Sequence, residues 1–282
     1  MIKHLLKNIL YHINSYPLES NHEYRFCYVF HTESIYNEHD FALLKSFCYD
    51  FFKITSKKAI CTVMPANNPQ IKIIMLQKNI KEELYVTRLK ELSAISQIGY
   101  HGHFYKDGKE IKPPVKEKET VTKQFNDEIQ WFKKNEIDTN NCYSGGWWYM
   151  NEDLIELLIS NNFNIDFTFT YNPNFKNIFS KEFLKTNDIS FGQPFYLNKI
   201  KYIQTLIGCH NTNFTDDFRR NLNKLIKNIP SNKKIIGALC THDYNLKDTI
   251  KMTIDCINNL ALNPNVSFFD LNDINKYDYK TL

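Results

Sequence analysis

The sequence predicts an α/β protein, a distorted (β/α) barrel of about seven strands, and three observations lead to that fold class. The chain has 282 residues with 43% hydrophobic and 15% aromatic content, which is enough to bury one large core. Runs rich in β-branched and aromatic residues alternate with segments of helical periodicity, which is typical of βα units around a parallel sheet. No internal repeat or compositional break divides the chain, so a single domain over residues 1–282 is expected.

The individual elements follow from the same patterns. The segments with the composition of strands span residues 24–30, 58–63, 98–101, 141–144, 165–168, 203–207, 235–238 and 266–269. The segments with helical periodicity span residues 40–53, 81–96, 122–135, 151–161, 215–228 and 246–260. Asn151 precedes two acidic residues and an apolar run, so it is predicted to cap its helix, and Asn245 is a second candidate cap.

Two segments lie outside this alternation. Residues 1–22 combine apolar and polar positions and are predicted to form an N-terminal helical extension that packs on the body of the protein. Residues 106–123 are rich in lysine, contain Pro113-Pro114 and have little apolar surface, so they are predicted to form an exposed loop. This loop directly follows a His-Gly-His sequence, and it is either a plain connector or a lid over a site.

Composition bears on partners and location. Lys+Arg number 35 against 31 Asp+Glu, and the charges are scattered, so no nucleic-acid partner is expected. The seven cysteines form no CxxC pair and are predicted to be buried free thiols in a reducing compartment. We find no run of 18 apolar residues and no cleavable export signal, so no membrane span and a cytoplasmic location are expected. No sequence feature indicates the oligomeric state.

The candidate site residues are the polar residues that follow the predicted strands, because the carboxyl ends of parallel strands converge on one face. Glu33 follows the first strand, and His101 and His103 end the third. A catalytic metal typically takes imidazole and carboxylate ligands, so these three residues are predicted to bind a divalent metal, with zinc as the leading candidate. In the alternative, one of the two histidines only donates a hydrogen bond to a carbonyl group.

The order of the motifs resembles that of the polysaccharide deacetylases of the NodB-homology type, also called carbohydrate esterase family 4. The resemblance covers residues 24–269. The matching segments are Phe30-His31-Thr32-Glu33, Ile98-Gly99-Tyr100-His101-Gly102-His103, Gly145-Gly146-Trp147-Trp148, Ile165-Asp166-Phe167-Thr168 and Leu239-Cys240-Thr241-His242. The resemblance implies a distorted (β/α) barrel, a divalent metal ion and hydrolysis of an N-acetyl group on an amino sugar.

The resemblance also implies roles for individual residues. His31 stands where the family has its general base, Glu33 stands where it has an acidic metal ligand, and His242 is the candidate general acid. Imidazole has an ordinary pKa near neutrality, so a histidine is chemically suited to the place of the base. Asp166 and Asp243 are candidates to accept the second N–H of a histidine, and otherwise they are solvated loop carboxylates.

The chain departs from the family pattern at two further positions. Tyr105 stands where the second metal histidine usually falls, so His103 would have to substitute for it. Ser144 stands about where an arginine often holds the catalytic aspartate. Trp147 and Trp148 form either a platform for a sugar ring or a plug in the barrel, and Tyr105 is a third candidate contact for the substrate.

These observations favour a metal-dependent deacetylase that acts on an N-acetyl amino sugar or on a sugar-nucleotide precursor of a surface glycan. The alternative is a catalytically inactive, carbohydrate-binding relative with the same fold, which the departures at His31, Tyr105 and Ser144 favour. Glycoside hydrolysis is a third reading, and it requires two opposed carboxylates, such as Glu33 and Asp166.

Overall fold

The computed structural model describes residues 21–113, 116–170, 178–209 and 233–282, and a large sheet dominates it. The strands of this sheet are β1 (Glu23–Thr32), β2 (Ile60–Val63), β3 (Gln97–Gly102), β6 (Cys142–Gly145), β7 (Ile165–Asp166), β8 (Phe195–Leu197), β9 (Ile200–Tyr202), β10 (Thr205–Cys209), β11 (Lys234–His242), β12 (Val266–Phe268) and β13 (Lys280–Thr281). A separate two-stranded hairpin consists of β4 (Tyr105–Lys106) and β5 (Lys109–Glu110).

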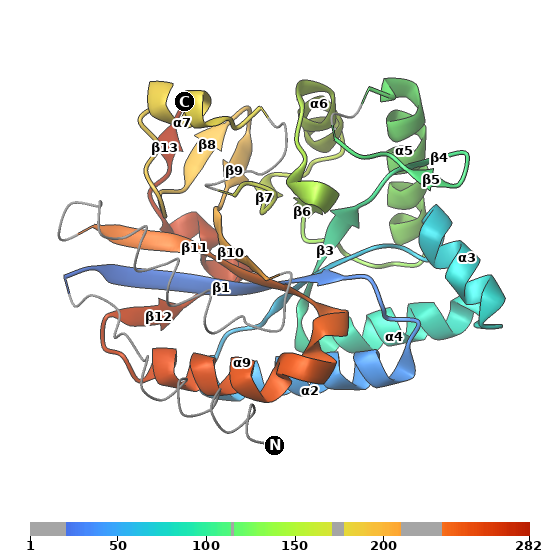
Figure 1. Ribbon diagram of the computed structural model, residues 1–282, viewed down its shortest axis with the longest axis horizontal. Helices are drawn as coiled ribbons and strands as arrows, with labels where there is room; N and C mark the ends of the chain where they lie inside the picture. Colours follow the sequence, from blue (N-terminus) through green and yellow to red (C-terminus); the bar gives the residue numbers. More distant parts are fainter. Residues whose placement is uncertain (1–20, 114–115, 171–177, 210–232) are drawn as a thin grey trace, which may run out of the picture.

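The large sheet has 11 strands in the order β10-β11-β1-β2-β3-β6-β7-β9-β8-β13, with β12 paired to β1 off this path. All neighbours from β10 to β9 pair in parallel, whereas β8 and β9 pair antiparallel. The sheet curls into a half-barrel that crosses the molecule (Figure 1). The predicted fold class is therefore confirmed, and each predicted strand overlaps a strand of the sheet; β8, β9 and β13 were not predicted.

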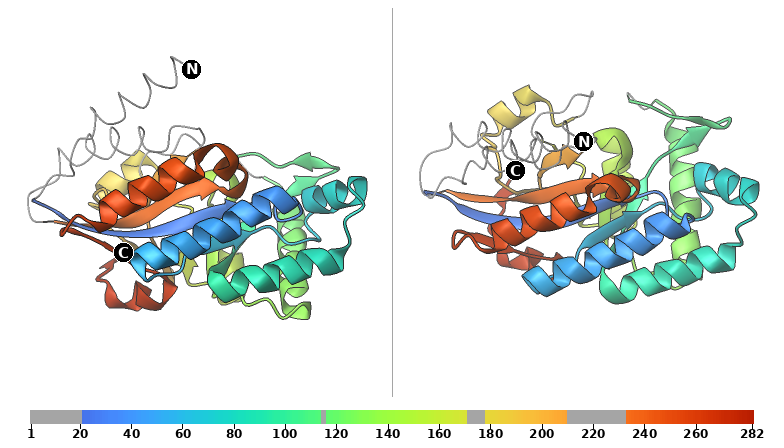
Figure 2. Two further views of the ribbon diagram at one scale, coloured as in Figure 1. Left: turned by 90° about the horizontal axis from the view of Figure 1, so that it is seen from below. Right: turned by 60° about the horizontal axis from the view of Figure 1, so that its bottom comes forward.

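The helices occupy the segments between the strands. They are α2 (Glu38–Thr55), α3 (Pro69–Gln77), α4 (Glu82–Ile95), α5 (Lys118–Lys134), α6 (Glu152–Ser160), α7 (Lys181–Thr186) and α9 (Leu246–Ala261), with 3-10 turns η1 (Gly146–Trp148), η2 (Asp243–Asn245) and η3 (Leu271–Lys276). Helices α9, α2 and α4 lie side by side on one face of the sheet (Figures 1 and 2). The predicted helix at 215–228 and most of the predicted extension at 1–22 lie outside the described residues.

The two predicted helix caps have different outcomes. The side chain of Asn151 accepts a hydrogen bond from the backbone N–H of Leu154 at 2.8 Å, so the predicted cap of α6 is confirmed. Asn245 makes no side-chain cap bond at the start of α9, and this prediction is wrong. The physical reason is that Asn245 ends η2 and already has helical φ and ψ of −81° and −16°, whereas a capping residue needs an extended backbone.

Strand β1 is buried on both faces, as expected for a strand inside a parallel sheet. Tyr28 and Phe30 point toward α2, where their ring centroids lie 4.7 and 4.9 Å from that of Phe47. Val29 belongs to the second buried cluster, on the other face of the sheet. Because side chains alternate along a strand, His31 points to the same side as Val29, which is the side away from α2.

The segment at 106–123 differs from the predicted exposed loop. It contains most of the β4–β5 hairpin, and α5 begins at Lys118 rather than at the predicted residue 122. The hairpin forms because Asp107 and Gly108 both have positive φ, 50° and 73°, which matches a tight turn between short strands. Residues 106–109 are exposed, but Glu110 is half-buried and faces the predicted site.

Two further expectations concern membrane-spanning helices and the cysteine thiols. Within the described part of the chain, no helix is long and apolar enough to cross a membrane. The cysteines whose side chains are described are all buried and free, in agreement with the sequence, and they are Cys27, Cys48, Cys61, Cys142, Cys240 and Cys256.

Candidate metal centre

The candidate site lies at the carboxyl ends of β1, β3 and β11. Parallel pairing places His31 of β1 directly beside His242 of β11, and β2 separates β1 from β3 in the sheet. Glu33 follows β1 by one residue, His101 lies within β3, and His103 follows β3 by one residue. Residues far apart in the chain therefore meet because the strands before them are parallel and in register.

Three of these side chains form a cluster that could hold a metal ion. The ligand atoms of Glu33, His101 and His103 all lie within 4.8 Å of one another. The Glu33 Oε1 atom lies 3.4 Å from His101 Nε2 and 3.6 Å from His103 Nε2, and the two Nε2 atoms are 3.0 Å apart. Ligands about 2.1 Å from a tetrahedral ion would be about 3.4 Å apart, so the spacing fits such an ion.

The hydrogen-bond partners of the two histidines support this fit. Nδ1 of His101 lies 2.8 Å from the backbone carbonyl oxygen of Ser144, which can only accept, so the network assigns the proton to Nδ1. Nδ1 of His103 contacts the Glu110 carboxylate, and the same assignment follows. In the neutral form both Nε2 atoms then present lone pairs to each other across 3.0 Å, an arrangement that a bound cation would stabilise; a proton on Nε2 of His101 would instead point to Glu33 at 3.4 Å.

The pKa shifts favour an ionised Glu33 and a neutral His101, which are the forms of these side chains that bind metals. Burial raises the pKa of Glu33, but the hydrogen bond from His101 and the nearby charges of His103 and His242 outweigh it and lower the pKa to about 2. Burial lowers the pKa of His101, although its contact with Glu33 opposes the shift. Glu33 is therefore ionised at neutral pH, and burial favours the neutral imidazole of His101.

Asp243 fixes the position of Glu33 through the backbone. Its carboxylate accepts hydrogen bonds from the backbone N–H groups of Glu33 at 3.1 Å and Ser34 at 2.8 Å. Burial raises the pKa of Asp243 to about 7, although these two hydrogen bonds oppose the shift. The sequence suggested that Asp243 orients a histidine or is a solvated carboxylate; instead it is 1% exposed and holds the loop that carries Glu33.

Asp166 also differs from the expectation. It is fully buried, and its carboxylate accepts hydrogen bonds from the backbone N–H and the hydroxyl of Thr168 at 2.9 and 2.8 Å. Thr168 in turn accepts a bond from the backbone N–H of Gly145 at 2.7 Å. Asp166 therefore closes the turn after β7 rather than orienting a histidine, because its nearest donors are in its own turn.

His103 lies in a tightly packed position beside the β4–β5 hairpin. Glu110, on β5, contacts His103 Nδ1, and Gly146 packs against the His103 ring so closely that a Cβ atom there would collide with it. The backbone carbonyl of His103 accepts hydrogen bonds from Asn68 and Gln124, both at 2.9 Å. The sequence analysis found His103 but neither Glu110 nor Asn68; the Asn68-Pro69 pair at the start of α3 is a helix-start signal that could have drawn attention to the latter.

A buried acid lies behind His103 and was also missed. Glu128 of α5 is fully buried and accepts hydrogen bonds from Asn68 at 3.0 Å, from Tyr100 at 2.8 Å and from Gln124 at 2.5 Å. Burial raises the pKa of Glu128 to about 7, although the three bonds oppose the shift. Asn68 and Gln124 thus link Glu128 to the backbone of His103. This network fixes the chain after β3.

His31 and Trp148 form the layer beneath the cluster. The His31 ring stacks on that of His101 with centroids 4.2 Å apart, and its Nε2 lies 2.9 Å from the Ser144 hydroxyl. Trp148 is 7% exposed and its ring centroid lies 4.9 Å from that of His31, so most of its ring is covered by protein. This burial favours the plug over the platform, and the predicted substrate contact at Trp148 stays a prediction.

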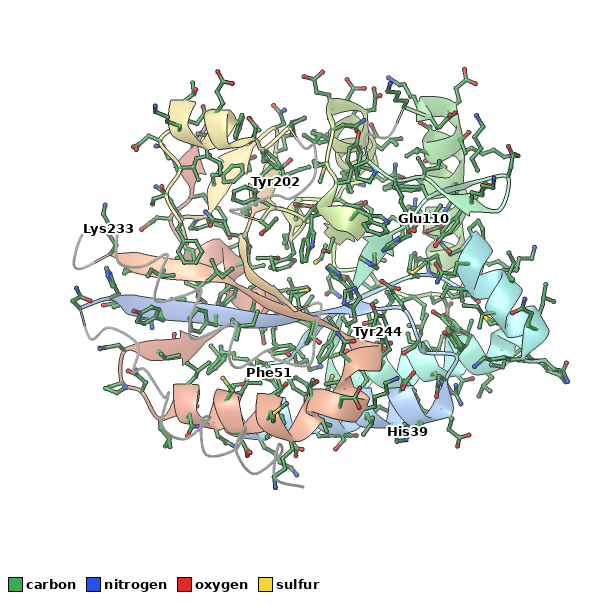
Figure 3. All side chains as sticks on the ribbon, in the orientation of Figure 1. His39, Phe51, Glu110, Tyr202, Lys233 and Tyr244 are labelled. Atoms are coloured by element: carbon green, nitrogen blue, oxygen red, sulfur yellow. The ribbon has the colours of Figure 1, made fainter. Side chains whose placement is uncertain are left out.

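Three further aromatic residues near the cluster are half-buried or exposed. Trp147 is half-buried, with the Lys112 Nζ atom 4.5 Å above its ring. Tyr105 is half-buried and its hydroxyl donates to the Gln70 side chain, away from the cluster. Tyr244 is 38% exposed and stacks on His242 with centroids 4.8 Å apart, and the sequence analysis did not single it out. Figure 3 labels Tyr244, in η2 just before α9, and Glu110 on the hairpin.

His242 completes the cluster. Its Nε2 lies 3.5 Å from Glu33 Oε1, and its ring lies 5.2 Å from that of His31. The structure thus brings together Glu33, His101, His103 and His242, as the sequence analysis expected of the strand ends.

Solved structures with a similar fold exist. The protein is similar to a protein of Mycobacterium smegmatis proposed to be a polysaccharide deacetylase, with a TM-score of 0.57, 10% sequence identity, and coverage of 95% of this chain and 96% of that chain. It is also similar to a 4-alpha-glucanotransferase from Thermococcus litoralis, with a TM-score of 0.53, 11% identity, and coverage of 93% of this chain and 41% of that chain. At these identities the likeness shows the fold alone. No family model and no curated protein matches the sequence.

Proposed function

We propose that the protein is a metal-dependent deacetylase that removes an N-acetyl group from an amino sugar. The observation that carries this proposal is the cluster of Glu33, His101 and His103, whose ligand atoms lie within 4.8 Å of one another at the carboxyl ends of a deacetylase-like parallel sheet. The two imidazoles and one carboxylate are the ligand set of a catalytic zinc site with one open position.

In this proposal Glu33, His101 and His103 hold the ion. When bound, a divalent ion supplies Lewis-acid activation of the acetamide carbonyl and of the attacking water. Ser144 and Glu110 hold the two imidazoles through their Nδ1 atoms, and Asp243 holds the backbone of Glu33. The water oxygen bonds to the carbonyl carbon, the C–N bond breaks, and the products are acetate and a free amine.

We assign proton transfer to His242. Its Nε2 lies 3.5 Å from Glu33 Oε1, and it is the candidate acid for the leaving amine. His31 is the candidate base from the sequence, but its Nε2 is bonded to the Ser144 hydroxyl and its ring lies under His101. These contacts favour a role for His31 in supporting the cluster, with His242 serving in turn as base and acid.

The substrate is a carbohydrate or a sugar nucleotide in this proposal. Tyr244 offers an exposed ring beside His242, and Trp147 a half-buried ring beside Lys112. Aromatic rings of this kind pack against the apolar faces of sugars. A precursor of a surface glycan would fit the cytoplasmic location expected from the sequence.

The first test is the metal content of the purified protein after reconstitution with zinc. Mass spectrometry should find about one ion per chain, and a Glu33→Ala/His101→Ala variant should lose it. The control is His39→Ala, an exposed histidine on α2. Loss of metal only in the double variant would justify screening acetamido sugars and sugar nucleotides for acetate release. Absence of bound metal in the reconstituted wild-type protein would refute the proposal.

A second candidate function is non-hydrolytic carbohydrate binding. The specific observation that favours it is the packing of His31, the residue in the place of the base, into the layer under His101. Sugar binding by the metal-free protein, weakened in Tyr244→Ala and unaccompanied by acetate release from the reconstituted protein, would select this function over the first.

A further inference from the structure

The feature that carries a further inference is the way in which the ring of His103 is held. His103 follows β3, which ends at Gly102, so the hydrogen-bonded ladder of the sheet does not fix it. We propose that Glu110, on the neighbouring hairpin, is the positioning residue of His103 and determines the direction of its Nε2. This inference rests on the metal site of the proposed function.

The register of the β4–β5 hairpin brings Glu110 beside the ring of His103. Tyr105 pairs with Glu110 across β4 and β5, and the backbone N–H of Ile111 donates to the carbonyl oxygen of Phe104 at 2.8 Å. The chain after His103 therefore turns back on itself, and the Glu110 carboxylate meets His103 Nδ1 seven residues later. The side chains are only 12% exposed for His103 and 22% exposed for Glu110, so the contact is largely shielded from water.

The contact lies on the far side of the ring from the ion-binding atoms. Glu110 touches Nδ1, whereas Nε2 faces His101 at 3.0 Å and Glu33 at 3.6 Å. Glu110 is therefore placed to orient the imidazole and to fix its tautomer, and not to bind the ion. A carboxylate that accepts the second N–H of a metal-binding histidine typically accounts for 10–100-fold in metal affinity.

The hydrogen bonds to the backbone of His103 do not determine the direction of its ring. Asn68 and Gln124 bond to its backbone carbonyl oxygen, which fixes the chain and leaves the side-chain torsions free. Gly146 closes one face of the ring by close packing. Glu110 is thus the contact that can select one ring orientation, and it offers a physical reason why a His-x-His spacing can present both imidazoles to one point.

The experiment measures zinc affinity in the full-length protein by competition with a chromophoric chelator. We expect Glu110→Ala to weaken zinc binding about 10–100-fold, and Glu110→Gln to lie between Ala and wild type because its amide oxygen can still accept from Nδ1. The matched control is Glu117→Ala on the same connecting segment, whose carboxylate pairs with Lys106 on the surface. Unchanged affinity in Glu110→Ala, with zinc-binding wild type, would overturn the inference.

A second readout separates this inference from the proposed function. Nitrogen NMR of the metal-free protein should find the proton of His103 on Nδ1 in the wild type and a mixture of tautomers in Glu110→Ala. If the wild-type protein binds no zinc but this change occurs, the metal proposal fails and the positioning role stands. An identical tautomer in both proteins would contradict the positioning role.

Discussion

The two ends of the sheet each carry a carboxylate with a strongly lowered pKa, and the two are built from different partners. At the carboxyl ends, burial raises the pKa of Glu33 and three histidines lower it to about 2. Near the amino ends of β2 and β3, burial raises the pKa of Asp273, and Lys276, Lys57 and a backbone N–H lower it to about 2. The same pKa shift thus arises at two sites of different character.

The difference between the partners indicates the function of each end. Lys57 and Lys276 lie 2.7 Å from the Asp273 oxygens and form ion pairs with them, and an ammonium group has no lone pair to offer a metal. Imidazoles can lose their protons and offer lone pairs to a metal. A lowered carboxylate pKa alone therefore does not identify a functional site. Partners that can lose a proton near neutral pH and then bind a metal are the better indication.

The largest expected effect is on metal binding at the carboxyl ends. Glu33→Gln keeps the shape of the side chain but removes the charged ligand, so we expect zinc affinity to fall by more than the roughly 100-fold of an outer-shell change. Isothermal titration of zinc would measure it. Glu38→Gln, an exposed carboxylate at the start of α2, is the matched control. Equal zinc affinity in Glu33→Gln and wild type would contradict the expectation that the carboxyl ends of the strands, unlike the amino ends, bind a metal through a carboxylate.

The next effect tests how closely the backbone approaches His103. Gly146→Ala adds a Cβ atom that collides with the His103 ring, so we expect zinc affinity to fall about 10-fold or more and stability to fall by about 1–3 kcal/mol. A double-mutant cycle with His103→Ala provides the control, because the added methyl group then has no ring to displace. Additive losses in the cycle would contradict the proposed collision.

At the amino ends we expect an effect on stability and none on zinc affinity. Asp273→Asn should lower the free energy of unfolding at pH 7 by about 1–2 kcal/mol, because it removes the ion pairs to Lys57 and Lys276. The folded pKa of Asp273 lies below its ordinary value of 3.8, so its contribution is present above about pH 4 and is lost as the pH falls through 2.

Urea unfolding at several pH values would measure this dependence. The difference between wild type and Asp273→Asn should shrink as the pH falls below about 4. Asp278→Asn, an exposed carboxylate in the same part of the chain, is the control. If the difference in unfolding free energy between the two proteins instead grows as the pH falls, the ion pairs of Asp273 do not stabilise the folded protein as proposed.

The smallest expected effect concerns the substrate. Tyr244→Ala should raise the KM for an acetamido sugar by up to about 10-fold, the equivalent of about 0.5–1.5 kcal/mol of aromatic packing, with little change in kcat. The control is Tyr49→Ala, which removes a comparably exposed ring from α2. A fall in kcat with constant KM would instead assign Tyr244 to the positioning of His242.

The strand ends could be predicted from the sequence, because a short apolar run followed by a polar residue is a local pattern. Glu33, His101 and His242 were found in this way. Glu110 could not be found, because its contact with His103 depends on the register of a two-residue hairpin in a lysine-rich segment. Glu128 is separated from its partner Asn68 by 60 residues, so nothing local in the sequence links them.

The backbone conformation at one further segment was not predicted. The Gly-Gly-Trp-Trp segment left open whether Trp148 forms a platform or a plug. In the structure Trp148 is 7% exposed, and the backbone at Trp147 and Trp148 is left-handed, with φ of 55° and 53°. Left-handed conformations are uncommon for large side chains and cost about 1–3 kcal/mol each, so sequence patterns do not predict them.

The pairing of Asp243 with the backbone after β1 has a consequence for the order in which the protein acquires its site during synthesis. Asp243 and Glu33 are 210 residues apart, and β11, next to β1 in the sheet, is made late. A nascent chain therefore carries all three candidate metal ligands long before the segment that holds Glu33 leaves the ribosome. Contacts of such long range slow folding, so we expect the last third of the chain to control when the site becomes competent.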